Sequence, residues 1–162
     1  MNKSEIKVGY VYYIKDTYFD VAQDDKLMRN YESGAYRPTY FCLKDEKTEL
    51  LWVVPMSTKT DKYKSIIDKD VEKYGACLKI LIARYGDGKS AFLFQNMFPI
   101  LPQYIDHAHT IAGIPMAVNI VVQEELTKRF KEVMRLHKRG VKIVFPNINR
   151  LEKLMLDELT DG

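Results

Sequence analysis

The chain has 162 residues, of which 46% are hydrophobic and 29% are charged. A chain of this length can bury roughly two thirds of the surface that it exposes when unfolded, and this composition excludes wholesale disorder. The net charge of +3 is too small to indicate a nucleic-acid partner by itself. No signal peptide and no stretch approaching the ~18 apolar residues of a membrane span is visible. We therefore expect one cytoplasmic domain over residues 1–162, without a membrane partner.

The first half of the chain has the pattern of β-strands, with apolar runs bounded by turn residues. Residues 8–15 predict a strand, and a short helix or ordered loop follows from Asp16. Residues 39–44 and 49–55 are two apolar runs joined by a polar connection, which predicts a β-hairpin. Because proline cannot donate to a sheet ladder, we expect Pro55 to end the second strand.

A second hairpin and two helices are predicted in the remainder. Residues 61–74 favour a helix, and residues 76–85 and 89–95 predict a hairpin around the turn GDG. The segment QEELTKRFKEVMRLHKRG has the apolar spacing of an amphipathic helix that ends at Gly140, and a final helix begins near Asn147.

This order of elements predicts an α+β fold. A β-rich part over residues 1–100 is followed by a helical part over residues 120–160. Such segregation is typical of a small, curved, antiparallel, barrel-like sheet with helices added on one side.

Several familiar kinds of chemical site find little support. The segment YGDGKS lacks the first glycine of a phosphate-binding loop, because Ala83 occupies that position. His107 and His109 have no Cys or Glu cluster to complete a metal site, and His137 lies on the apolar face of a helix, where a packed core residue is the simpler reading. No nucleophile elbow is present for acyl transfer. We expect neither a metal nor a cofactor.

The segment PMSTKTDKY, residues 55–63, is the remaining candidate. It places two hydroxyls, Ser57 and Thr58, and two ammonium groups, Lys59 and Lys62, just beyond a buried strand. Hydroxyls can hold phosphate oxygens, and a lysine can offset the charge that develops on phosphorus during in-line attack. A solvated turn that happens to contain these residue types is the alternative.

Four stretches, in order along the first 100 residues, carry a family resemblance: YIKDTYF at 13–19, Arg37-Pro38, PMST at 55–58 with the adjoining lysine, and NMFPI at 96–100. With them the chain resembles the ToxN/AbiQ family of RNA-cleaving toxins from type III toxin–antitoxin systems, and within it the CptN branch. Two departures stand out. Lys59 follows Thr58 directly, where the family has an intervening proline, and Tyr63 stands where the family has a histidine.

The resemblance implies a MazF/PemK-like fold and a metal-independent endoribonuclease that leaves a 2′,3′-cyclic phosphate. RNA carries its own nucleophile, the 2′-OH, so the protein need only align it, help to remove its proton and neutralise charge. On this reading Ser57 and Thr58 hold phosphate oxygens and Lys59 stabilises the transition state or transfers a proton. Arg37 grips phosphate, and Tyr18 hydrogen-bonds the sugar-phosphate or stacks on a base.

Two further residues and the partners complete the expectation. Lys62 is an alternative to Lys59 as the catalytic lysine, and Tyr63 is expected to contact RNA beside it. The resemblance implies a small, repeat-derived, structured antitoxin RNA and a closed protein–RNA assembly, with the basic residues of the helix near 128–139 as a second RNA surface. A PemK/MazF-type toxin with a protein antitoxin and a non-catalytic RNA-binding module remain as alternatives.

Overall fold

A computed structural model of the chain describes residues 2–161, and it has the α+β composition that the sequence predicts. The helices are α1 (Asp16–Ala22), α2 (Thr60–Tyr74), α3 (Ile120–Lys138) and α4 (Ile148–Asp161). The principal sheet contains β1 (Val11–Ile14), β4 (Thr39–Lys44), β5 (Leu51–Ser57), β6 (Ile80–Tyr85), β7 (Gly88–Leu93), β8 (Phe98–Ile100) and β9 (Ile105–Ala108). Two small hairpins are β2 (Tyr31–Glu32) with β3 (Ala35–Tyr36), and β10 (Thr110–Ile111) with β11 (Ile114–Pro115); short 3-10 helices cover Lys3–Glu5, Phe94–Asn96 and Pro102–Tyr104.

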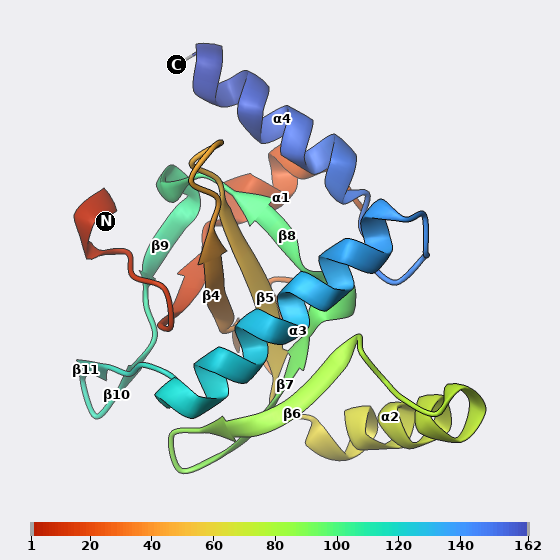
Figure 1. Cartoon of the computed structure of the whole chain (residues 1–162). Coiled ribbons are helices and arrows are strands. Elements are labelled where there is room, and N and C mark those ends of the chain that lie inside the picture. Colours follow the sequence, from red (N-terminus) through yellow and green to blue (C-terminus); the bar gives the residue numbers. More distant parts are fainter. Residues whose placement is uncertain (1, 162) are drawn as a thin grey trace.

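The principal sheet is antiparallel and strongly curved. Its strands run in the order β6-β7-β5-β4-β1-β9, with β8 paired to β5 (Figure 1). The edge strands β6 and β9 do not pair, so the expected barrel is not closed. The two edges nevertheless approach each other, because the hydroxyl of Tyr85, at the end of β6, lies 2.9 Å from Nδ1 of His109, just after β9.

Strand β5 connects the two parts of the sheet, and the prediction that Pro55 ends it is wrong. Residues Leu51 to Val53 of β5 pair with β8, whereas Met56 and Ser57 pair with β7. Pro55 lies between the stretch of β5 that pairs with β8 and the stretch that pairs with β7. On that edge of β5 it has no partner strand, so its missing N–H breaks no ladder hydrogen bond there. The strand therefore continues to Ser57 and delivers its hydroxyl to the end of the sheet.

The remaining predicted elements are present with shifted bounds. The strand predicted at residues 8–15 is shorter, and the helix predicted at 61–74 begins one residue earlier. Strands continue to Pro115, so the β-rich part does not end at residue 100. The prediction of His137 as a core residue is wrong, since its side chain is half-exposed and lies 2.9 Å from the amide oxygen of Asn149.

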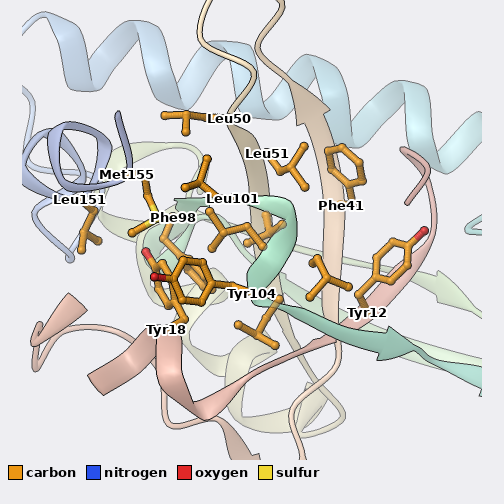
Figure 2. Packing of buried hydrophobic residues seen from close by; sticks show 14 of the residues in the cluster. Tyr12, Tyr18, Phe41, Leu50, Leu51, Phe98, Leu101, Tyr104, Leu151 and Met155 are labelled. Atoms are coloured by element: carbon orange, nitrogen blue, oxygen red, sulfur yellow. The ribbon is translucent and has the colours of Figure 1, made fainter. Parts of the chain in front are cut away.

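Three buried clusters hold these elements together. One lies between the sheet, α1 and α4, where Leu151 and Met155 of α4 meet Phe98 of β8 (Figure 2). The second lies under α3, which crosses the sheet and packs Phe130 against Trp52 with ring centroids 5.8 Å apart. The third joins α2 to β6 and β7.

The helix ends follow ordinary capping rules. The side chain of Asn119 caps α3 by accepting from the N–H of Val121, and Gly75, with φ of 82°, ends α2 in the left-handed conformation. Among residues 2–161, no helix combines the length and the apolar character that crossing a bilayer requires.

Candidate active site

A pocket of about 190 Å³ opens beside the end of β5, at the point where α2 begins. The β2–β3 hairpin forms one wall, β1 another, and the start of β7 a third. Its lining includes hydroxyls, a carboxylate and aromatic rings: Tyr13, Glu32, Ser33, Ala35, Tyr36, Pro38, Met56, Ser57, Thr58 and Ser90. The hydroxyl pair predicted from the sequence thus lines a real pocket.

A buried ion pair lies beside this pocket, and one of its members, Glu32, lines the pocket. Nη1 of Arg37 lies 2.6 Å from Oε2 of Glu32, and both side chains are about one-tenth exposed, at 10% and 9%. The same nitrogen donates to the carbonyl of Met56 at 3.0 Å, while Nε donates to the carbonyl of Arg29 at 2.8 Å. Arg37 therefore ties the hairpin to β5.

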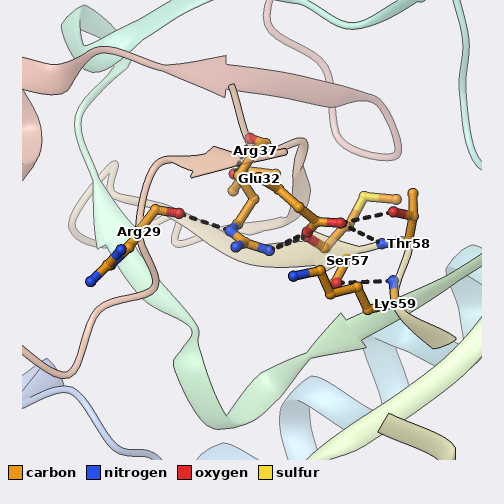
Figure 3. A network of polar contacts seen from close by, with 8 residues as sticks. Arg29, Glu32, Arg37, Ser57, Thr58 and Lys59 are labelled. Carbon is orange, nitrogen blue, oxygen red and sulfur yellow. Dashed lines mark hydrogen bonds and ion pairs between the residues drawn. The ribbon is translucent and has the colours of Figure 1, made fainter. Parts of the chain in front are cut away.

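Glu32 also binds the hydroxyl segment. Its Oε1 accepts from the hydroxyl of Thr58 at 2.8 Å and from the Thr58 N–H at 3.1 Å. Figure 3 shows Arg37 and Thr58 approaching the carboxylate from opposite sides. Burial alone would raise the pKa of Glu32, but the hydrogen bonds from Thr58 and Ser57 and the charge of Arg37 outweigh it and hold that pKa below its ordinary value.

Ser57 has a different arrangement from Thr58. It is buried, and its oxygen accepts from the backbone N–H of Lys59 at 3.1 Å, which fixes the turn into α2. No side chain caps the start of α2. The N–H of Thr60 donates to the Thr58 carbonyl at 2.8 Å, so among the described residues the N–H groups of Asp61 and Lys62 are the ones open to an anion.

The two candidate lysines lie at this helix start and are exposed. Among residues 2–161, neither Lys59 nor Lys62 forms an ion pair with a carboxylate. The ammonium group of Lys62 lies 5.3 Å from the ring centroid of Tyr63. Both cations are therefore available to a phosphate that enters beside Ser57.

The expectation that Tyr18 contacts RNA is wrong for this structure. Tyr18 is 0% exposed, stacks on Phe98 and donates its hydroxyl to the carbonyl of Pro99 at 2.9 Å. Burial drives its pKa far above the ordinary value for tyrosine. Two of the stretches that carry the family resemblance, around Tyr18 and Pro99, are thus partners in the core and account for the fold rather than for the chemistry.

Arg37 and Tyr63 also have roles different from those expected. The bonds of Arg37 go to protein carbonyls and to Glu32, so it positions the carboxylate rather than gripping phosphate. Tyr63 is 4% exposed and packs in the cluster between α2 and the β6–β7 hairpin. Burial raises the pKa of Tyr63, the positive charge of Arg37 opposes this rise, and the negative charge of Glu32 adds to it.

Sequence reasoning missed Glu32, Tyr36 and Ser90. A signal for the first two exists in the stretch YESGAY, where Ser33 and Gly34 both adopt positive φ, 53° and 84°, in the two-residue turn between β2 and β3. An S-G pair between two short aromatic runs is a hairpin signal. Ser90 joins the pocket only through the pairing of β7 with β5, which no local pattern reveals.

A second, larger groove of about 630 Å³ lies between α3, α4 and the ends of β4 and β5. Its floor includes Trp52, Phe130 and Met134, and its basic lining residues are Lys131, Arg135, Lys138 and Arg139. Arg129 does not belong to it, because its guanidinium donates to the carbonyls of Cys77, Leu78 and Ile80.

The histidines near β9 do not form a metal-ligand cluster. Nδ1 of His107 lies 3.5 Å from the carboxylate of Asp106, and within residues 2–161 no three His, Cys, Asp or Glu side chains are grouped as ligands would be. Both His107 and His109 instead lie against the ring of Tyr13, at centroid distances of 4.7 and 5.6 Å.

Comparison with known proteins finds this fold in an endoribonuclease of a type III toxin–antitoxin system. The structure is that of AbiQ, a lactococcal anti-phage protein of that class, which this chain matches with a TM-score of 0.67. The match covers 96% of this chain and 100% of AbiQ, at 11% sequence identity. No family model and no curated protein matches the sequence. The chain therefore has the fold of AbiQ, which confirms in structure the resemblance inferred from the sequence.

Proposed function

We propose that this protein is a sequence-selective, metal-independent endoribonuclease toxin that acts on RNA in the cytoplasm and is inhibited by a small structured antitoxin RNA. A role in defence against phage accompanies this reading, by analogy with AbiQ. The observation that carries the proposal is the pocket at the end of β5. There, on the fold of an RNA-cleaving toxin, Ser57, Thr58 and two unpaired lysines surround an uncapped helix start.

The pocket suits phosphoryl chemistry that uses the RNA's own 2′-OH. Ser57 and the first turn of α2 hold the non-bridging oxygens, and Lys59 offsets the charge that develops on phosphorus or transfers a proton. In-line attack then yields a 2′,3′-cyclic phosphate and a 5′-hydroxyl. Lys62, one turn into the helix, remains the alternative cation.

Glu32 acts in this proposal as a positioning residue. A carboxylate whose pKa is lowered is a weak proton acceptor at neutral pH, so it is poorly matched to take the proton of the 2′-OH. It holds Thr58 instead, and Thr58 donates its hydroxyl to Glu32 in the free protein. For Thr58 to hold a phosphate oxygen, the arriving RNA must take over that hydrogen bond.

The groove beside α3 is the second surface in the proposal. Its four basic residues outnumber the two carboxylates of Asp45 and Glu152 and can hold phosphates of the antitoxin RNA, whereas Trp52 and Phe130 are buried beneath them. Two toxin-binding surfaces per RNA unit would link protein and RNA alternately into a closed assembly.

The mechanism is tested with purified protein and a single-stranded RNA. Cleavage should continue in excess EDTA and stop when the nucleotide at the cut site lacks its 2′-OH. Products with a 5′-phosphate and a 3′-hydroxyl, or loss of cleavage on chelation, would show that the proposed chemistry is wrong.

The assignment of the lysine is tested by substitution. Lys59→Ala and Thr58→Ala should lower the cleavage rate on the order of a hundredfold or more and leave RNA affinity nearly unchanged, as expected for groups that act on the transition state. Lys69→Ala, an exposed lysine farther along α2, is the matched control and should cleave normally. Loss of cleavage in Lys62→Ala but not in Lys59→Ala would transfer the role to Lys62.

The two alternatives predict different partners. Purification with the neighbouring upstream DNA should yield a discrete bound RNA, and ribonuclease or high salt should weaken the assembly. A small acidic protein in its place would favour a toxin with a protein antitoxin. Undiminished function of the Ser57→Ala, Thr58→Ala and Lys59→Ala variants would favour a non-catalytic RNA-binding module.

A further inference from the structure

A continuous row of six aromatic rings leads away from the pocket. Its members come from segments far apart in the sequence, namely β1, β2, β3, the end of β6, and β9 with the residue that follows it. The row, in spatial order, consists of Tyr31, Tyr36, Tyr13, His107 and His109 side by side, and Tyr85.

The rings touch one another in sequence along the row. Tyr31 stacks on Tyr36 at 5.0 Å, and Tyr36 lies 6.0 Å from Tyr13. Tyr13 contacts both histidines, and His109 lies 5.6 Å from Tyr85. These are the centroid distances of favourable aromatic pairs.

The row lies outside the interior of the protein. Tyr13, Tyr31 and Tyr36 belong to none of the buried clusters described above. Tyr31 is 48% exposed, His107 is exposed, and the others are half-buried. Tyr85 packs against the second cluster, so the aromatic surface available to a ligand is mainly that of Tyr13, Tyr31, Tyr36 and His107.

The row and the pocket share residues. Tyr13 and Tyr36 line the same pocket as Ser57 and Thr58. A strand whose phosphate sits at the hydroxyls must therefore pass these rings within one or two nucleotides.

Charge indicates which way such a strand runs. Beyond Tyr31, a cleft of about 830 Å³ is lined by the carboxylates of Asp16, Asp20, Asp24 and Asp25, which outnumber the one cation, Arg29, and repel phosphate. Arg84 and Lys89 pair in the β6–β7 ladder, but successive side chains of a strand alternate between its faces, so Arg84 faces away from Tyr85 and the row. Because carboxylates gather beyond Tyr31, the path from Tyr36 through Tyr13 toward Tyr85 is the one that suits a polyanion.

We propose that this row stacks the bases that flank the scissile phosphate of single-stranded RNA. The proposal rests on the proposed function, because it takes the pocket as the place where that phosphate binds. Aromatic rings stack on any base, and this contact typically supplies much of the affinity for single strands. Neighbouring rings are already in contact, so the bases lie on the outer faces of the row rather than between its rings.

Binding of an uncleavable RNA tests the row separately from cleavage. The probe is a fluorescent 2′-O-methyl oligoribonucleotide of about ten nucleotides, within the usual span of a single-strand site. Its abasic counterpart keeps every phosphate and lacks every base. Tyr36→Leu should weaken binding of the base-containing strand on the order of tenfold, and binding of the abasic strand much less. Tyr36→Phe should bind as the unaltered protein does.

A matched substitution elsewhere provides the control. Tyr74 is 69% exposed near the end of α2 and lies outside the row, so Tyr74→Leu should leave binding of both strands unchanged. His107→Leu, on the other side of Tyr13, should reproduce the base-dependent loss and serves as the second variant should Tyr36→Leu fail to fold.

The outcomes separate the inference from the function on which it rests. Equal weakening of both strands, or equal behaviour of the row variants and Tyr74→Leu, would overturn base stacking even if the protein cleaves RNA. Base-dependent binding that the row variants abolish would support stacking even if ordinary RNA is left uncut, in which case the nuclease proposal alone fails. Binding of a protein across the row, with no base-dependent RNA contact, would also overturn it.

Discussion

Removal of the Arg37 side chain should be among the most destabilising substitutions in the region of the site. Arg37→Met leaves the carboxylate of Glu32 only 9% exposed and without its counter-ion, and leaves the Met56 carbonyl without this donor. Breaking a buried ion pair from one side typically costs about 3–5 kcal/mol. For a chain of 162 residues, where each kcal/mol shifts the melting temperature by roughly 2–4 °C, Tm should fall by about 6–20 °C.

Urea unfolding of a small set of variants checks this magnitude. Lys64→Met, which breaks the exposed Lys64–Asp68 pair, should cost no more than about 1 kcal/mol. The double variant Glu32→Leu with Arg37→Met should recover much of the loss, because it removes both charges together. A cost for Arg37→Met as small as that of the Lys64 control would refute the reasoning that the pair is buried and mutually dependent.

Other predictions concern pH, burial and backbone conformation. The folded pKa of Glu32 lies below its unfolded value, so its stabilising effect should be complete above about pH 4.3 and disappear as pH falls through the folded pKa. The difference in unfolding free energy between the unaltered protein and Glu32→Gln, measured across this pH range, tests the prediction. Tyr18→Phe should cost about 1–3 kcal/mol in urea unfolding, because the buried Pro99 carbonyl loses its donor. Gly9→Ala should cost more than about 1 kcal/mol, because Gly9 has φ of 94° and a Cβ would meet the Gln123 amide at 2.5 Å.

Local pattern was sufficient for the helices and for most strands, because each carries its own periodicity or turn signal. The helix at Thr60–Tyr74 and the strand at Thr39–Lys44 follow from such signals, and the structure confirms them. The rule that proline ends a strand was insufficient at Pro55. The strand beside β5 changes there from β8 to β7, so no hydrogen bond from the Pro55 nitrogen is required. The order of strands in a sheet depends on the whole chain, so it cannot be read from any short segment of one sequence.

The same distinction explains the candidate site. Ser57, Thr58 and Lys59 were identified because they are adjacent in the chain. In the structure Ser57 and Thr58 line the pocket, and the backbone N–H of Lys59 donates to the Ser57 hydroxyl. Glu32 was missed because its partners, the Thr58 hydroxyl and the Arg37 guanidinium, come from two other segments, just after β5 and just after β3. Sequence also suggested which residue types would contact RNA without showing which of them would be exposed. The roles predicted for Tyr18, Tyr63 and Arg37 differ from those in the structure because all three side chains are buried.

The observed positions of Arg37, Tyr18 and Tyr63 change which groups are expected to bind the RNA around the phosphate. With Arg37 held by Glu32, the free positive charge at the pocket comes from the lysines at the start of α2, and binding there is expected to be weak without further contacts. Stacking on the row that begins at Tyr36 and Tyr13 supplies contacts that do not depend on salt. RNA affinity should therefore fall less steeply with salt than in a protein that binds through phosphates alone, for which each neutralised phosphate of a single strand adds about 0.7 to the logarithmic slope. A fluorescence titration of the oligonucleotide from low to high salt measures that slope. Tyr36→Leu should lower the affinity at every salt concentration and leave the slope unchanged. A steep slope for the unaltered protein, close to one phosphate for each nucleotide bound, would show that phosphate contacts rather than rings hold the strand.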